Sequence, residues 1–236
     1  MRRLLSRVVL ALISFFILSP QATLAHQPRI VNGTNITVLN PEVSQAFYGQ
    51  LQGTPVDFQI SSPQEFKLYV GLLVPDITGV KTDISAEVYR MKDGKKESLA
   101  ILDGAKFKWT PFYEEFAKDN YFWGPEFAAT DSVKGVDLKG KDVPAGDYHI
   151  RVYSQSNRGK YVAVFGYLES FPLNEALGSL VIIPQLKINF FNESLPVVFS
   201  SPFVWGPTLF ICVLVIVAVC LLRRIIGKKP KTPRRK

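Results

Sequence analysis

The chain has 236 residues, with 28 basic and 20 acidic side chains and a formal net charge of +8. This length allows one domain of ordinary size with short segments at its ends. The positive charge does not indicate a nucleic-acid binder, because three basic residues lie in 1–25 and eight in 223–236. Without those eleven, 17 basic residues oppose 20 acidic ones, and the middle of the chain carries a net charge of −3.

Residues 1–25 have the organisation of a secretory signal peptide. Three arginines precede an apolar run over 8–18, which is too short to span a bilayer. The run is followed by Ala-Thr-Leu-Ala, with small residues at positions −3 and −1 of a cut after Ala25. We therefore predict an exported protein whose mature chain begins at His26.

A second apolar segment, 204–222, contains no charged residue and is followed by a tail, 223–236, with eight basic and no acidic residues. Nineteen helical residues extend about 28 Å, close to the thickness of the hydrocarbon core. Basic residues beside a span indicate its cytoplasmic end. We predict a single-pass protein of the cell membrane with its N-terminus outside, a stalk over 189–203, and a basic cytoplasmic tail able to contact anionic lipid.

Between these segments, residues 26–188 are predicted to form an all-β, jelly-roll-like sandwich ectodomain. Short apolar runs separated by turn residues are typical of such folds. Asp93-Gly94 predicts a hairpin between 84–90 and 97–102, residues 66–74 read as one strand, and 145–167 reads as a second hairpin. The only helical pattern in this region, 173–182, is expected to end before Pro184.

The order of these patterns resembles the bacterial pre-peptidase C-terminal domain over about 44–166. The residues that carry the resemblance are Gly49, Leu51, Ala145-Gly146-Asp147-Tyr148 and Gly159-Lys160-Tyr161. The resemblance implies a jelly-roll-like accessory module of secreted or surface proteins, without catalytic residues. This chain departs from that pattern by an additional aromatic-rich segment at 107–141.

That segment is a candidate binding surface, since 107–127 holds nine of the 29 aromatic residues of the chain. Rings with polar edges can stack on sugars or anchor a protein partner. Alternatively, the segment folds back to cover the second face of the sheet, because both faces of the strand at 161–168 are apolar. The candidate binding residues are Trp109, Phe112, Tyr113, Tyr121 and Trp123.

A copper site is a second hypothesis, in which the amine and imidazole of His26 act with His149. The strand pattern opposes it, because Tyr148, Ile150 and Val152 form the inward set and place His149 outward beside a cation. Acidic residues at 131, 137, 142 and 147 also form a loop series, but their spacing matches no calcium loop. No cofactor is therefore predicted.

Catalysis is a third hypothesis, in which Glu114 or Glu115 belongs to a polysaccharide-active enzyme. Adjacent side chains diverge in a strand or a helix, and a glycosidase needs two carboxylates across a cleft. Both cysteines, Cys212 and Cys220, lie in the predicted span, and an exported region without cysteines favours a bacterial or archaeal source. Three glycosylation triplets favour the opposite, but such triplets often arise by chance, and we predict a bacterial protein. We predict a non-catalytic surface module that binds a protein or glycan, or acts as a scaffold.

Overall fold

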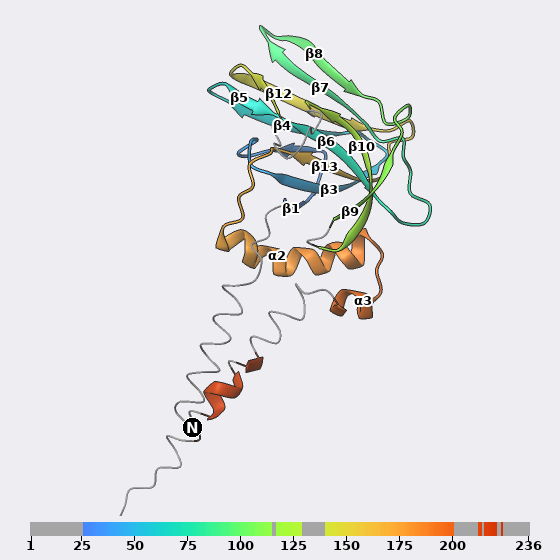
Figure 1. Cartoon of the computed structure of the whole chain (residues 1–236). Helices are drawn as coiled ribbons and strands as arrows, with labels where there is room; N and C mark the ends of the chain where they lie inside the picture. The colour runs from blue at the N-terminus through green and yellow to red at the C-terminus, as the bar shows by residue number, and fades with distance from the viewer. Residues whose placement is uncertain are drawn as a thin grey trace, which may run out of the picture.

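In the computed structural model two β-sheets face one another, and a helical segment lies across the outside of one of them (Figure 1). The structure describes residues 26–114, 117–128 and 140–200, together with 212–213, 215–220 and 223. The six-stranded sheet has the order β1-β3-β13-β6-β10-β9. Its strands are β1 (Gln27–Ile30), β3 (Gln45–Gln52), β6 (Val70–Pro75), β9 (Thr110–Glu114), β10 (Asp119–Phe127) and β13 (Arg158–Phe165).

The second large sheet has five strands in the order β2-β4-β12-β7-β8, and a two-stranded ribbon pairs β11 with β5. Pairing is antiparallel except for β1 with β3 and β2 with β4, which run parallel. The all-β sandwich predicted from the sequence is confirmed. These strands are β2 (Asn35–Thr37), β4 (Val56–Ser62), β5 (Phe66–Leu68), β7 (Ser85–Lys92), β8 (Lys95–Leu102), β11 (Lys141–Val143) and β12 (Gly146–Tyr153).

The main core lies between the two large sheets and is built from alternate residues of their strands. Phe47 of β3, Phe58 of β4 and Phe165 of β13 meet there, with ring centroids 5.2–5.4 Å apart. Tyr148, Ile150 and Val152 of β12 are also fully buried, so the predicted inward set of this strand is confirmed. Each large apolar side chain buried in this way contributes about 1.5–3 kcal/mol.

The predicted hairpin over 145–167 is wrong. β12 pairs with β4 and β7 in the five-stranded sheet, whereas β13 pairs with β3 and β6 in the other sheet. The turn between them is therefore an arch that crosses the core, held by the Asn157 N–H to the Ser154 carbonyl at 3.0 Å. The arch places the inward side chains of both strands in the same core, which a hairpin within one sheet would not do.

Of the other local predictions, one hairpin is confirmed and one strand is wrong. β7 and β8 form the predicted hairpin, and positive φ angles at Asp93 (52°) and Gly94 (71°) fit a tight primed turn. The single strand predicted at 66–74 is instead two, because the chain leaves β5 after Leu68 and enters the six-stranded sheet as β6. The hydrophobic pattern of the sequence does not reveal that the chain changes sheet between β5 and β6, because the residues on both sides of this junction are buried.

The outer face of the six-stranded sheet is covered by α2 (Leu173–Gln185) and the π-helix η1 (Leu186–Phe190), which follows it directly. The expected end before Pro184 is wrong, because this proline lies inside α2. The helix continues with the wider hydrogen-bonding pattern of η1, in which the Phe191 N–H donates to the Leu186 carbonyl at 2.9 Å. Burial of Leu186, Phe190 and Phe191 stabilises the continuation.

A second apolar cluster joins this helical segment to the sheet. Val162 and Val164 of β13 point into it, which confirms that both faces of that strand are covered. Its cover comes from Ile182 of α2, Leu186 and Phe190 of η1, and the following Phe191. Tyr121 and Trp123 of β10 belong to the covered sheet itself, so the described part of 107–141 does not form the expected cap. The boundary expected between domain and stalk at 188–189 falls within η1, and a short helix, α3 (Leu195–Ser200), follows.

The segment expected as an insertion contributes two strands, β9 and β10, to one end of the six-stranded sheet. The signal peptide predicted at 1–25 lies outside the described residues, as do most of the predicted span at 204–222 and most of the tail. Within the described residues, no helix has both the length and the apolar character needed to cross a membrane.

Candidate functional site: the open sheet face

The two large sheets differ in what covers their outer faces. The six-stranded sheet has α2 and η1 on its outer face, whereas no element among the described residues packs on that of the five-stranded sheet (Figure 1). We call the outward side chains in the middle of this second sheet the open sheet face. They are Asp57 and Gln59 of β4, Glu87 and Tyr89 of β7, Ile101 of β8, and His149, Arg151 and Tyr153 of β12.

Strand register arranges these side chains in rows. Arg151 of β12 lies between its two register partners, Asp57 of β4 and Glu87 of β7, and Ile101 of β8 follows Glu87. This places a guanidinium between two carboxylates across three adjacent strands. The next row places His149 between Gln59 and Tyr89. Cross-strand neighbours have Cβ atoms about 5 Å apart, so each row can contact one ligand.

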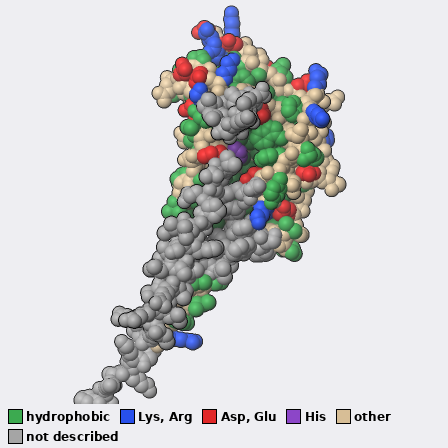
Figure 2. Space-filling view, viewed as in Figure 1, with side chains coloured by type: hydrophobic (Ala, Val, Ile, Leu, Met, Phe, Trp, Pro, Cys, Tyr) green, Lys and Arg blue, Asp and Glu red, His purple; other side chains and the backbone are tan. Residues whose placement is uncertain are grey.

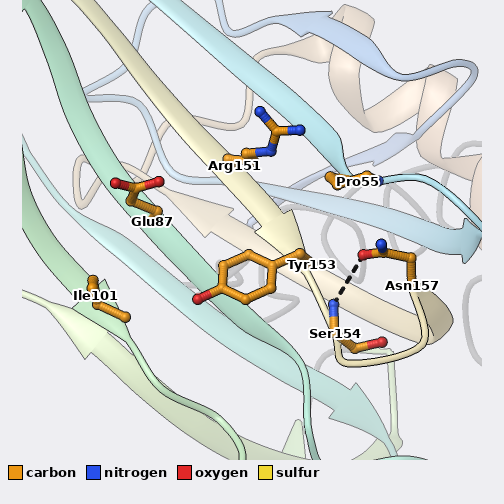
Figure 3. Close-up of a pocket in the computed structure, with 7 residues that line it drawn as sticks. All are labelled: Pro55, Glu87, Ile101, Arg151, Tyr153, Ser154 and Asn157. Carbon is orange, nitrogen blue, oxygen red and sulfur yellow. Dashed lines mark hydrogen bonds between the residues drawn. The ribbon is translucent and has the colours of Figure 1, made fainter. Parts of the chain in front are cut away.

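A shallow depression of about 370 Å³ opens at one end of this face (Figure 3). Ser154 and Asn157 of the arch form one wall, where the Ser154 N–H donates to Asn157 Oδ1 at 3.3 Å. The ring of Tyr153 lies across the depression, with its hydroxyl on the side of Ile101 and Glu87 (Figure 3). The lining residues are Pro55, Glu87, Ile101, Arg151, Tyr153, Ser154 and Asn157.

Two rings on the face are already ordered by contact with one another. Tyr89 and His149 stack with centroids 5.0 Å apart and an interplanar angle of 7°. Lys96 Nζ lies 4.3 Å from the Tyr89 ring centroid and donates to Glu87 Oε2 at 2.6 Å. Burial raises the pKa of Tyr89, and the nearby carboxylate of Asp57 raises it further, so its hydroxyl stays protonated at neutral pH.

The polar groups of the face are unevenly paired. Within the described residues the guanidinium of Arg151 makes no hydrogen bond or ion pair, although its neighbour Glu87 is held by Lys96. Asp57 Oδ1 is buried and has no hydrogen-bond partner in the same part of the chain. The exposed, unpaired guanidinium of Arg151 favours contact with a polar ligand, because a charge-assisted hydrogen bond is stronger than a neutral one.

The five aromatic residues predicted as a binding platform do not form one exposed group. Trp109 packs against the main core and donates from Nε1 to the Gly104 carbonyl at 2.8 Å. Tyr121 is buried and its hydroxyl is 3.0 Å from that of Tyr48. Phe112 and Tyr113 are exposed on β9, while Trp123 is half-buried against Phe112, with ring centroids 5.0 Å apart. A role for these residues in binding stays a prediction.

The structure does not bring the two histidines together. His26 precedes β1 at the edge of the six-stranded sheet, and its Nδ1 is hydrogen-bonded to Ser44 Oγ. His149 lies on the outer face of the opposite sheet, in its central strand. Among the described residues, no three His, Cys, Asp or Glu side chains are grouped as a metal site.

The predicted carboxylates of the enzyme hypothesis are only partly described. Glu114 Oε2 accepts a hydrogen bond from the Ala117 N–H at 2.6 Å and so holds the turn between β9 and β10. Glu115 lies outside the described residues, as do positions 131 and 137 of the acid series. Asp142 pairs with Lys67 at 2.9 Å, and Asp147 is exposed.

One buried ion pair was not anticipated from the sequence. Lys187 of η1 donates to Asp119 Oδ1 of β10 at 2.6 Å, and the two side chains are only 3% and 4% exposed. Burial raises the pKa of Asp119 to about 6, although the hydrogen bond from Lys187 lowers it. The sequence offered one signal for this pair, a lysine within an apolar helical stretch. It did not indicate the partner, because Asp119 lies 68 residues earlier in the chain.

The chain is similar to known proteins in structure rather than in sequence. No family profile matches the chain, and no curated relative does. Among solved structures it is similar to the pre-peptidase C-terminal domain of a collagenase from Bacillus anthracis, at 9% identity and a TM-score of 0.29, over 61% of this chain and 97% of that one. The kind of domain that the sequence resembles is therefore also among the solved structures that this chain matches.

Two other solved structures are similar over part of the chain. AvmM, which catalyses macrocyclization in alchivemycin A biosynthesis, matches 58% of this chain and 62% of its own, at 12% identity and a TM-score of 0.23. A β-glucosidase from Paenibacillus barengoltzii matches 63% of this chain and 14% of its own, at 8% identity and a TM-score of 0.20. No ligand or activity is transferred from any of them.

Proposed function

We propose that this protein is an exported, single-pass membrane protein whose β-sandwich is a non-catalytic binding module displayed outside the cell. The observation that carries the proposal is the contrast between the two sheets. One is covered on its outer face, and the other presents charged and aromatic side chains in rows on a face that the described elements leave open.

A glycan is the ligand class that this face fits best. Arg151 offers paired N–H donors beside the carboxylates of Asp57 and Glu87, and such groups bind neighbouring hydroxyls of a sugar through charge-assisted hydrogen bonds. The ring of Tyr153, which lies across the depression, supplies apolar area with a polar edge. The depression is open and shallow, which suits a segment of an extended chain rather than an enclosed small molecule.

The membrane anchor is supported by the sequence at both ends. An uncharged stretch of 19 residues is followed at once by a tail with eight basic residues, and an arginine-led apolar segment begins the chain. Alkaline extraction of membranes tests this part. The full chain should stay with the bilayer, and a variant ending at Phe203 should be released.

Glycan binding is tested with the full chain in nanodiscs on an array of bacterial and plant polysaccharides. We expect binding to at least one polysaccharide, reduced about tenfold or more by Arg151→Ala, since loss of a charged hydrogen-bonding group costs about 1.5–3 kcal/mol. Lys108→Ala is the matched control, because it removes one exposed cation outside the open sheet face. Equal affinities for the two variants would contradict the proposed site.

A further inference from the structure

The exposed side of the α2–η1 segment has an unusual composition for a surface helix. Its apolar residues Leu173, Leu177 and Val181 recur every four positions and therefore lie along one side, and Ile188 of η1 is exposed as well. The other exposed residues of this segment are Asn174, Gly178, Gln185 and Asn189, none of them charged. We call the exposed side chains of 173–190 the outer helix face.

Both charged residues of the segment are turned away from that face. Glu175 receives two hydrogen bonds from Arg29 of β1, at 2.7 and 2.9 Å. Lys187 is buried against Asp119. A helix that faces water normally carries its charges outward. Here the charges connect the helix to the sheet, and the solvent side holds only apolar and uncharged polar groups.

The chain that follows limits how far this face can be from a membrane. Val198 of α3 is buried, and the predicted span begins only six residues later, at Val204. Six extended residues reach about 21 Å. Figure 1 shows α2 on the side of the domain from which α3 and the helical residues 215–220 extend, with the sandwich on the other side.

We propose that the outer helix face lies on the outer leaflet of the membrane that anchors the chain. A segment of 18 residues is about 27 Å long, and its exposed apolar side chains would enter the boundary between headgroups and acyl chains. The open sheet face would then point away from the bilayer, because it belongs to the sheet on the far side of the sandwich. This inference rests on the proposed membrane anchor.

The test uses the full chain with Cys212→Ser and Cys220→Ser, reconstituted in phosphatidylcholine vesicles. Val181→Cys carries an environment-sensitive fluorophore, and Ile101→Cys is the matched control, since the two side chains are 61% and 64% exposed. We expect nitroxide-labelled phosphatidylcholine to quench the label at 181 and not that at 101. Aqueous iodide should quench the label at 101 several-fold more strongly.

A second substitution checks that the apolar surface is responsible. Leu177→Glu should lower lipid quenching of the label at 181, because a carboxylate is costly to bury in the interface, and Leu177→Met should leave it unchanged. Equal iodide quenching at 181 and 101 overturns the inference. So does protection from iodide without lipid quenching, which indicates a protein partner or a second copy.

Vesicle flotation of the same preparation separates the two proposals. If the chain floats but the label at 181 is quenched in the same way as the label at 101, the membrane anchor is present and the helix is not docked. A chain that does not float overturns both the anchor and the inference.

Discussion

Two buried tyrosines of the core provide a matched comparison at the scale of single residues. Tyr148 and Tyr161 are both completely buried. The hydroxyl of Tyr148 donates to the Pro144 carbonyl at 2.7 Å, whereas that of Tyr161 has no hydrogen-bond partner within the described part of the chain. Burial raises the pKa of Tyr161 above its ordinary value, so the group stays neutral. One hydroxyl therefore stabilises the fold and the other costs free energy.

Tyr148→Phe should lower the free energy of unfolding by about 1 kcal/mol, since it removes a satisfied hydrogen bond. Tyr161→Phe should raise it by about 1 kcal/mol, because it removes an unsatisfied buried hydroxyl. Urea unfolding followed by tryptophan fluorescence measures both values. The same sign for the two substitutions would show that Tyr161 is hydrogen-bonded in solution.

Gly49 is one of the residues that carry the resemblance, and the structure shows why a glycine is needed there. It is the register partner of Tyr161, and a Cβ atom at this position would lie 2.5 Å from the ring and from the hydroxyl. The glycine therefore makes room for the buried ring of the neighbouring strand. Both positions belong to the motif pattern, and the structure shows that they contact one another.

Gly49→Ala should lower the free energy of unfolding by about 2–3 kcal/mol through overpacking. Gly178→Ala is the control, because a Cβ there meets nothing within 4 Å and alanine favours a helix by about 1 kcal/mol. Differential scanning fluorimetry should give a lower melting temperature for the first variant and a higher one for the second. A neutral Gly49→Ala would mean that Tyr161 has space to move.

At the scale of elements, the ion pair between Lys187 and Asp119 joins η1 to β10. Lys187→Met leaves a buried carboxylate without its partner, which costs about 3–5 kcal/mol. The carboxylate then has a folded-state pKa further above its unfolded value, since the hydrogen bond that lowers it is lost. Folding therefore favours the protonated, neutral form of Asp119. The resulting contribution to the free energy of unfolding is present at low pH and is lost as pH rises through the folded-state pKa.

The loss of stability in Lys187→Met should therefore be larger at pH 8 than at pH 5. Urea unfolding at the two pH values measures the difference. The double variant Asp119→Asn with Lys187→Met should recover part of the loss at pH 8, because position 119 then carries no buried charge. Recovery should be incomplete, since the carboxylate of Glu193, 3.6 Å from Lys187 Nζ, also loses its partner. A loss that is independent of pH would show that Asp119 is not the group that responds.

The elements also show how far local patterns reach. Asp93-Gly94 predicted its hairpin correctly, since both residues adopt the positive φ that the turn needs. The turn at 154–159 also contains residues with positive φ, Asn157 and Gly159, but it connects two sheets, because strand partners are decided by packing over the whole core. Pro184 failed as a helix end for a related reason, since burial of Leu186 and Phe190 stabilises the continuation.

The candidate site depends on strand order even more strongly. Alternation along β12 predicted that His149 and Arg151 point outward. This is confirmed, because Tyr148, Ile150 and Val152 are buried. The neighbours of Arg151 come from strands 94 and 64 residues earlier in the chain, at Asp57 and Glu87. A sequence pattern contains no register between distant strands, so the rows of the open sheet face could not be predicted.

At the scale of the whole molecule, the two sides of the sandwich present different surfaces. The α2–η1 segment covers one sheet and presents an uncharged surface on the side of the predicted span, while the open sheet face lies on the other sheet. In Figure 2, which has the view of Figure 1, several basic and acidic side chains lie at the top, at the end of the domain opposite α2. A bilayer on one side and an aqueous ligand on the other fit this distribution.

The most direct test of membrane display is thiol labelling of spheroplasts that express the full chain with Cys212→Ser and Cys220→Ser. A membrane-impermeant maleimide should label Ile101→Cys in intact spheroplasts, and should label Lys236→Cys only after permeabilisation. This result would establish an external domain and a cytoplasmic tail. Labelling of Lys236→Cys in intact spheroplasts, or protection of Ile101→Cys until permeabilisation, would contradict the topology and with it the proposed function.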